Sequence, residues 1–289
     1  LSAPSAGTSS RAASAKLLHL DAEQARMAFG IAGSRAGSLS INTGTMTKSS
    51  HSGHAARMGV ECALLAGMGW TATADVFGAG GYFDTFLSGA AEPDLLLAGF
   101  AAPLRMLDPG VGFKKHPCNY FTHRPVDAAL AIRRDATFDA EQIEDVEIVF
   151  PNLHYVDRAF PASGLDGKFS LQYTTAIALL DGILTIDSFT DDRRFSPDVE
   201  RLLPKIRVTF DDTISKEFLE LHAVVTVRLS GGSVLSERVD KLTGMPGVPL
   251  TEGEILRKFR SCATRVLPES AVDELAGLLL DVDRLPSIR

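Results

Sequence analysis

The sequence lacks any long uninterrupted apolar segment. The apolar stretch at residues 95–104 is broken by Gly99 and Pro103, and it is shorter than the roughly 18 residues that a membrane-spanning helix needs. We therefore expect a soluble protein that has no membrane partner.

Cysteine is scarce. The chain has three cysteines, Cys62, Cys118 and Cys262, and no pair of them has the CxxC spacing that many zinc and iron–sulfur sites use. The sequence therefore predicts no metal cluster. An odd and sparse cysteine count is typical of a reducing compartment, so we expect a cytoplasmic protein.

Positive charge is also in deficit. The chain has 29 Lys and Arg against 36 Asp and Glu, which gives a formal net charge of −7. Nucleic acids and anionic membranes bind basic surfaces, so neither is expected as a partner. An anionic substrate would have to be attracted by lysines gathered at one place.

The pattern of apolar residues changes at about Pro109 and Pro246 and predicts three segments. Residues 1–108 and 247–289 have helical periodicity, with a capping-box-like start at Asp21 and Gln24 and later helices at 251–264 and 269–280. The middle segment, 109–246, combines helices at 124–134 and 170–180 with alternating apolar strands. Those strands lie at 146–150, 206–210, 225–229 and 233–239, and Gly231–Gly232 predicts a hairpin between the last two. The fold class is therefore α+β, with an antiparallel sheet in 109–246.

Residues 43–59 contain the first candidate site, TGTMTKSSHSGHAARMG. Small and hydroxylated residues carry Lys48 and His51 on what we expect to be a loop, followed by a helix that begins near residues 52–54. The free N–H groups of such a helix would suit an anionic ligand beside Lys48. Without a ligand, Lys48 would lie in solvent and the histidines would cap the helix.

Residues 113–123 contain the second candidate site, FKKHPCNYFTH. A metal site would use His116, Cys118 and His123, but these spacings across a proline do not match common zinc motifs. A Cys118 nucleophile with a histidine base is a second interpretation. The sequence marks no base that would pair with it.

A third interpretation of the same segment is carboxylate binding. Lys114 and Lys115 would hold a carboxylate, and Asn119 and His123 would act as neutral donors. The purely structural alternative is that His123, with the threonine before it, caps the following helix while both lysines lie in solvent.

Four segments of the sequence resemble the MmgE/PrpD family, and they occur in the same order. They are TKSSHSGHAARMGVECALLA, GFKKHPCNYFTHRPVDAAL, FPNLHYVDRAFP and FSLQYTTAIALLDG. The resemblance implies a helical domain interrupted by an inserted α+β lid, with residues 247–289 returning to the helical domain. It also implies that Lys48, His51, Lys114 and Tyr155 are functional residues and that the protein is a homodimer.

The resemblance further implies a cofactor-free lyase, of the dehydratase or decarboxylase type, that acts on a small di- or tricarboxylate such as 2-methylcitrate or cis-aconitate. Lys48 and Lys114 would hold carboxylates, and His51 and Tyr155 would carry protons. Asn119 stands where the decarboxylases of the family have a histidine, which weighs against decarboxylation. The N-terminal helices of the family have no counterpart here, so we expect the chain to lack that part. An amino-dicarboxylate epimerase and an inactive binding protein remain alternatives.

Overall fold

The computed structural model describes residues 12–87, 92, 98, 102–104 and 106–287. The start of the serine- and alanine-rich N-terminus and most of the apolar stretch 95–104 lie outside these residues. The chain forms two compact units, Leu1–Leu104 and Arg105–Arg289, and each is described by itself. Among the described residues, none of the helices has both the length and the apolar character needed to cross a bilayer.

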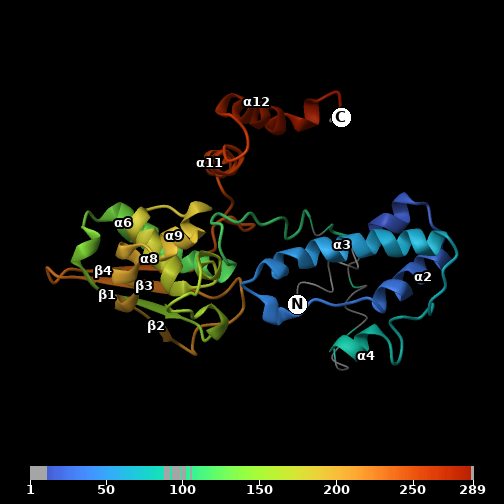
Figure 1. Cartoon of the computed structure of the whole chain (residues 1–289), viewed down its shortest axis with the longest axis horizontal. Helices are drawn as coiled ribbons and strands as arrows, with labels where there is room; N and C mark the ends of the chain where they lie inside the picture. Colours follow the sequence, from blue (N-terminus) through green and yellow to red (C-terminus); the bar gives the residue numbers. More distant parts are fainter. Residues whose placement is uncertain (1–11, 88–91, 93–97, 99–101, 105, 288–289) are drawn as a thin grey trace. The chain divides into compact units, whose positions relative to one another are not determined.

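The first unit is helical, with α2 (Ala22–Gly33), α3 (Met46–Gly67) and α4 (Tyr82–Leu87) labelled in Figure 1. The predicted capping box is confirmed, because Asp21 Oδ1 accepts the N–H of Gln24 at 2.8 Å and Gln24 Oε1 accepts the N–H of Asp21 at 3.1 Å. Small residues let α2 and α3 pack closely. A Cβ on Gly30 would lie 2.6 Å from the carbonyl oxygen of Thr73, so only glycine fits there.

The start of α3 differs from the prediction. The helix begins at Met46, after the extended cap residue Thr45, whereas the sequence predicted a loop up to residues 52–54. Serine and threonine are weak helix formers but are tolerated in a first turn, where the backbone N–H groups need no helical partner. Lys48 and His51 therefore lie on the first two turns of a helix. They do not lie on a flexible loop.

The second unit contains a four-stranded sheet with the order β2-β1-β3-β4. The strands are β1 (Ile143–Phe150), β2 (Ile206–Phe210), β3 (Ala223–Leu229) and β4 (Val234–Val239), which confirms the predicted strands. β3 pairs antiparallel with both β1 and β4, but β1 and β2 are parallel, with Val146 opposite Ile206. The predicted α+β fold with an antiparallel sheet is confirmed for the pairs β1–β3 and β3–β4. The β1–β2 pair differs because the long helical connection 151–205 provides the crossover that a parallel pair requires.

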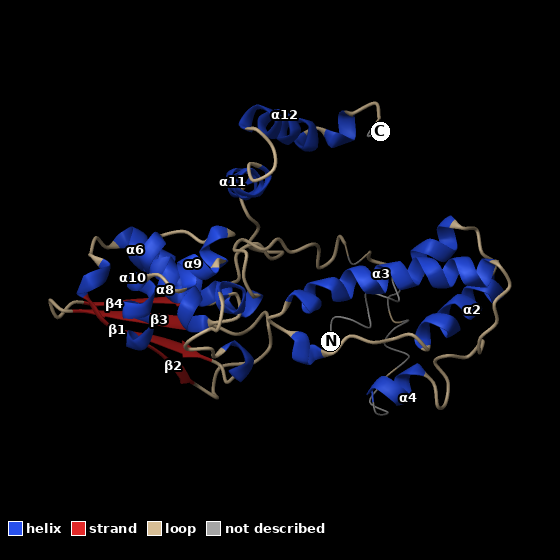
Figure 2. Cartoon of the chain, in the orientation of Figure 1, coloured by secondary structure: helices blue, strands red, loops and turns tan. Residues whose placement is uncertain are grey.

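Helices cover one face of this sheet, as Figure 2 shows, and the two predicted helices of this layer are confirmed as α6 (His123–Asp135) and α8 (Leu171–Asp181). The shorter helices are α7 (Gly164–Gly167), α9 (Asp191–Arg194) and α10 (Pro197–Leu202). Val146, Ile148 and Phe150 of β1 point into this layer and are fully buried. On the opposite face, Asp145 and Glu147 form ion pairs with Arg207 and Arg228 of the neighbouring strands.

The chain ends in two amphipathic helices, α11 (Glu252–Ala263) and α12 (Glu269–Leu280), at the predicted positions. Thr251 and Glu254 form a second capping box at the start of α11. None of the twelve residues of α11, all of which the structure describes, is buried. The expected return of residues 247–289 to the helical domain stays a prediction.

Candidate active site

Three of the predicted site residues lie together in the second unit. Asn119 caps the short 3₁₀ helix Tyr120–Thr122, because its Oδ1 accepts the N–H of Phe121 at 2.9 Å. The hydroxyl of Tyr155 lies 3.5 Å from the same Oδ1. Lys114 reaches this segment from the other side of the loop, since its Nζ donates to the carbonyl oxygen of Cys118 at 3.0 Å. We call Lys114, Asn119 and Tyr155 the Lys114 cluster.

The ammonium of Lys114 is oriented by an aromatic ring that the sequence did not single out. Its Nζ lies 4.7 Å from the centre of the Tyr120 ring, a distance at which a cation is attracted to the face of an aromatic system. The backbone that carries Lys114 is fixed as well, because the N–H of Phe113 donates to the carbonyl of Gly244 at 2.7 Å. Tyr120 directly follows the predicted Asn119, so its place in that segment was the sequence signal that could have identified it as a partner of Lys114.

The phenol of Tyr155 keeps its proton in this environment. Burial raises the pKa of Tyr155 to about 12, and the hydrogen bond to Asn119 only partly opposes that shift. A phenol releases its proton readily near neutral pH only if its pKa is lowered, and the structure gives the opposite direction. At neutral pH the hydroxyl therefore keeps its proton and is not suited to act as a base, and the raised pKa also makes it a weaker acid than an ordinary phenol.

Lys115 and His116 belong to a buried polar network on the other side of the loop. Asp127 of α6 accepts hydrogen bonds from Lys115 Nζ at 3.0 Å and bonds to His116 Nε2 at 2.9 Å. Burial by itself would raise the pKa of Asp127, but the hydrogen bond to His116 and the charge of Lys115 outweigh it and hold that pKa below its ordinary value. The ammonium of Lys115 is thus bound to a carboxylate of its own chain, and the sequence did not indicate Asp127 as its partner.

His123 is fully buried at the start of α6. Its ring packs between those of Tyr120 and His116, with centroids 5.0 and 5.1 Å away. The structure therefore brings Lys114, Asn119 and Tyr155 together and places His123 behind them, beneath Tyr120. A role for His123 and Lys115 in binding a substrate stays a prediction.

Cys118 has the properties of a structural thiol. It is buried, and the hydroxyl of Thr122 donates to its Sγ at 3.1 Å. Burial raises the pKa of Cys118 to about 12, so the thiolate that a nucleophile needs is scarce at neutral pH. Within the part of the chain that the structure describes, no group of three or more His, Cys, Asp or Glu side chains is placed to hold a metal ion.

The other two predicted residues, Lys48 and His51, lie on α3 in the first unit. Lys48 is exposed, and His51 is half-buried. His51 lines an open hollow together with His54 and Arg57. These three residues follow one another at intervals of three, which places them along one side of the helix. That spacing is the sequence signal that could have added Arg57 to the candidate residues.

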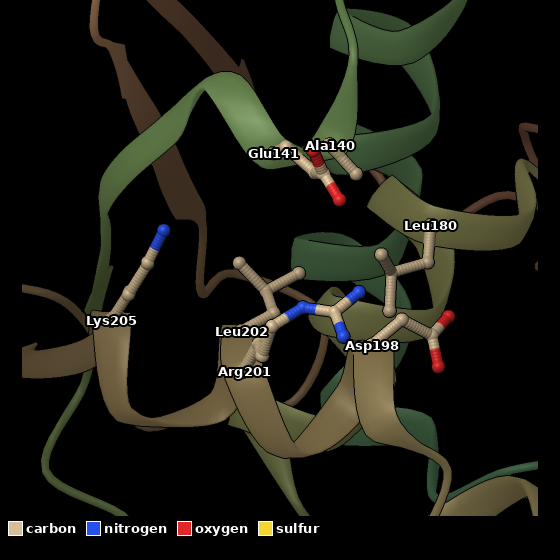
Figure 3. Close-up of a pocket in the computed structure, with 7 residues that line it drawn as sticks. All are labelled: Ala140, Glu141, Leu180, Asp198, Arg201, Leu202 and Lys205. Carbon is tan, nitrogen blue, oxygen red and sulfur yellow. The ribbon is translucent and has the colours of Figure 1, made fainter.

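A hollow of ≈ 200 Å³ elsewhere in the second unit contains none of the predicted residues (Figure 3). Figure 3 shows Arg201 and Glu141 pointing into it from different elements. Asp198, on its rim, already binds the guanidinium of Arg193 at 2.9 Å. Because side chains of both charge signs line this hollow, it would attract a polyanion less strongly than the Lys114 cluster would.

Because the imidazole of His123 is buried, we expect the stability of the fold to depend on pH. Burial, followed by the charge of His116, lowers the pKa of His123 from 6.5 to about 3. Between these values the unfolded chain binds a proton that the folded chain does not, so the free energy of unfolding should fall as the pH is lowered. The expected loss is up to about 1.4 kcal/mol per pH unit below pH ~6.5. Urea denaturation at a series of pH values measures it.

The matched control is His123→Phe, which replaces the ring by an apolar one that does not titrate. Its unfolding free energy should lose this part of the pH dependence. The carboxyl of Asp127, whose pKa is also lowered, adds a loss of the same sign only below its ordinary pKa of 3.8. An equal slope between pH 6 and pH 5 in both proteins would contradict the assignment to His123.

Comparison with known proteins matches both units. The model of the MmgE/PrpD N-terminal domain matches residues 3–95, and that of the MmgE/PrpD C-terminal domain matches residues 116–283. Cis-aconitate decarboxylase of Mus musculus is 32% identical over 283 residues, which cover 96% of this chain and 58% of that protein. The Homo sapiens protein of the same name is 31% identical with the same coverage.

A more distant relative has a different activity in its name. The 2-methylcitrate dehydratase of Cupriavidus necator is 23% identical over 190 residues, which cover 60% of this chain and 38% of that protein. The chain thus spans 58% of the length of the two mammalian relatives. The matched part includes both Lys48 and the Lys114 cluster.

Proposed function

The chain belongs to the MmgE/PrpD family, and from this premise we propose that it carries part of the active site of a lyase that acts on a small tricarboxylate. Cis-aconitate is the first candidate substrate and 2-methylcitrate the second, after the names of the relatives. The observation that carries the proposal is the Lys114 cluster, in which a fixed ammonium and a protonated phenol lie on either side of Asn119.

Lys114 supplies the charge that holds a carboxylate in this proposal. A tricarboxylate carries up to three negative charges, and a reaction beside a carboxylate adds further negative charge to the neighbouring carbon. A fixed ammonium stabilises that charge without having to reorient at the moment of reaction. For Lys48 we likewise propose that it binds a carboxylate.

Tyr155 supplies a proton. In a decarboxylation, the bond between the carboxyl carbon and the chain breaks, its electron pair stays on the substrate, and the phenol protonates the resulting carbanion. In a dehydration, His51 would remove the proton beside the carboxylate, and the phenol would protonate the leaving hydroxyl. The phenol is protonated at neutral pH, as the donor in both reactions must be, although its raised pKa makes it a weaker acid than an ordinary tyrosine.

Turnover by the purified chain tests the proposal. The chain is incubated with cis-aconitate, 2-methylcitrate and citrate, and carbon dioxide release and the ultraviolet absorbance of unsaturated products are followed. Carbon dioxide from cis-aconitate identifies a decarboxylase, and an unsaturated product from 2-methylcitrate identifies a dehydratase. Binding of these compounds without turnover of any of them would overturn the lyase proposal and favour a binding protein.

We further propose that the enzyme is a homodimer, as the family resemblance implied, and that it is cytoplasmic, as the sparse cysteines indicate. In that arrangement residues 247–289 return to the helical domain. Light scattering of the purified chain measures the number of subunits. A monomer at all concentrations would contradict this part of the proposal and leave the assignment of the Lys114 cluster intact.

A further inference from the structure

A groove of ≈ 220 Å³ lies between α11 and the segment that follows α8. Residues 182–186 form one side of it, and Arg257, Lys258 and Cys262 of α11 form the other. None of Lys114, Asn119 and Tyr155 lines it. We call it the α11 groove.

The position of α11 over the groove is fixed near the middle of the helix and just beyond its C-terminal end. Lys258 Nζ donates to the carbonyl oxygen of Lys114, and just after the helix the guanidinium of Arg265 binds Asp187 Oδ1 at 2.6 Å. Lys114 and Lys115 lie in different surroundings. The side chain of Lys114 belongs to the Lys114 cluster, whereas Lys115 lines the α11 groove.

One wall of the groove is apolar. Gly182 ends α8 with a positive φ of 67°, which turns the chain and allows the following residues to pass over the surface. Ile183 is consequently 59% exposed. Leu184, Ile186 and Leu130 continue the wall beside it. A ligand with an aliphatic part would remove this surface from water.

The rim of the groove is cationic. Lys115, Arg257 and Lys258 all line it. The acidic residue among the lining groups is Glu254, and its carboxylate already accepts the N–H and the hydroxyl of Thr251, both at 2.9 Å, in the cap of α11. Lys115 is already paired with Asp127, so Arg257 and Lys258 supply the positive charge of the rim. The carboxylate of Glu254 offsets part of that charge and leaves the rim net positive.

From this pairing of an aliphatic wall with a cationic rim, we propose that the α11 groove binds an aliphatic monocarboxylate. The carboxylate lies against Arg257 and Lys258, and the hydrocarbon chain covers Ile183 and its neighbours. A tricarboxylate has no apolar part to place on that wall, so the groove is distinct from the proposed substrate site. The inference does not rest on the proposed lyase activity.

A series of chain lengths tests the inference with the unmodified protein. Hexanoate, octanoate and decanoate are titrated calorimetrically into the chain, with 1-octanol and citrate as comparisons. Affinity should rise by up to about fourfold for each added methylene, the equivalent of ~0.8 kcal/mol of apolar burial, until the wall is covered. Octanoate should bind at least about tenfold more tightly than octanol, because only the carboxylate meets the rim. Affinity that does not depend on length, or tighter binding of citrate than of octanoate, would overturn it.

Cys262 gives a second readout that locates the ligand. It is exposed and lines the groove, whereas Cys62 and Cys118 are buried. Octanoate at saturation should therefore slow alkylation of Cys262 by iodoacetamide, and citrate at the same concentration should not. An alkylation rate that octanoate leaves unchanged would show that octanoate binds elsewhere, and the proposed site would be wrong.

Two variants separate the roles of the rim and the wall. Arg257→Ala and Ile183→Asp both change exposed side chains, and each should weaken octanoate binding by about tenfold or more. Arg201→Ala is the matched control, since it removes an exposed arginine of the same unit that does not line the groove. Equal octanoate affinity in the Arg257→Ala variant and the control would overturn the proposed contact.

Discussion

Replacement of Lys114 by alanine is expected to lower kcat/KM for the tricarboxylate by about 10- to 150-fold. A charge-assisted hydrogen bond to a carboxylate is worth roughly 1.5–3 kcal/mol, and about 1.4 kcal/mol corresponds to a factor of ten. The ammonium is already oriented by the Cys118 carbonyl and the Tyr120 ring before any substrate arrives. The variant therefore loses a preorganised contact, and steady-state kinetics on the substrate that the chain turns over measures the loss. Lys48→Ala should act in the same direction.

The control for this experiment is Lys241→Ala, which removes one exposed lysine of the same unit and lies outside the Lys114 cluster. Both variants change the net charge equally, so a general electrostatic effect would appear in both. Circular dichroism should be unchanged in either, because Lys114 is exposed. A loss of activity of similar size in the Lys241→Ala protein, or full activity in the Lys114→Ala protein, would contradict a specific role for Lys114.

Phe150→Ala is expected to lower the free energy of unfolding by about 3–5 kcal/mol, the usual cost of emptying a buried aromatic site. Phe150 is fully buried at the end of β1, opposite Phe210 of β2. Its carbonyl accepts the N–H of Asp211 at 3.0 Å, so the backbone is held even when the ring is lost. The cost should therefore arise from the cavity. Urea denaturation followed by circular dichroism measures it.

Val234→Ala serves as the comparison, because Val234 belongs to the same sheet but is 54% exposed. Its effect should remain within about 0.5 kcal/mol. Phe150 also lies close in sequence to the proposed site, since it ends β1 five residues before Tyr155. A cost below ~1 kcal/mol for Phe150→Ala would show that the site collapses around the missing ring, and the packing argument would be wrong.

Local patterns in the sequence predicted most of the elements, because the physical causes of those elements are themselves local. The capping box at Asp21 and Gln24 depends on residues three apart, and the strands of the sheet show their alternation within five residues. The parallel pairing of β1 with β2 was missed, since it depends on how residues 151–205 fold between them. The start of α3 at Met46 was missed because its first turn contains residues that are equally common in loops.

Only part of the candidate site could be predicted from the sequence. Lys114, Asn119 and Tyr155 could be named from the family-like segments, and the structure gathers these three in one unit. The direction of the Tyr155 pKa and the ion pair between Lys115 and Asp127 could not be read from the sequence. Both depend on which groups become buried together, and burial is set by the whole fold.

The strand order leaves β2 and β4 at the two rims of the sheet, each with backbone groups available to a further strand. Such rims are where stray chains add on and aggregates begin. In β4 the side chain of Glu237 is half-exposed and that of Arg238 is exposed. In β2 the guanidinium of Arg207 forms ion pairs with Asp145 and Glu147. A foreign strand that docked at either rim would have to strip water from these charges, which protects the sheet against unwanted growth while its core remains strongly apolar.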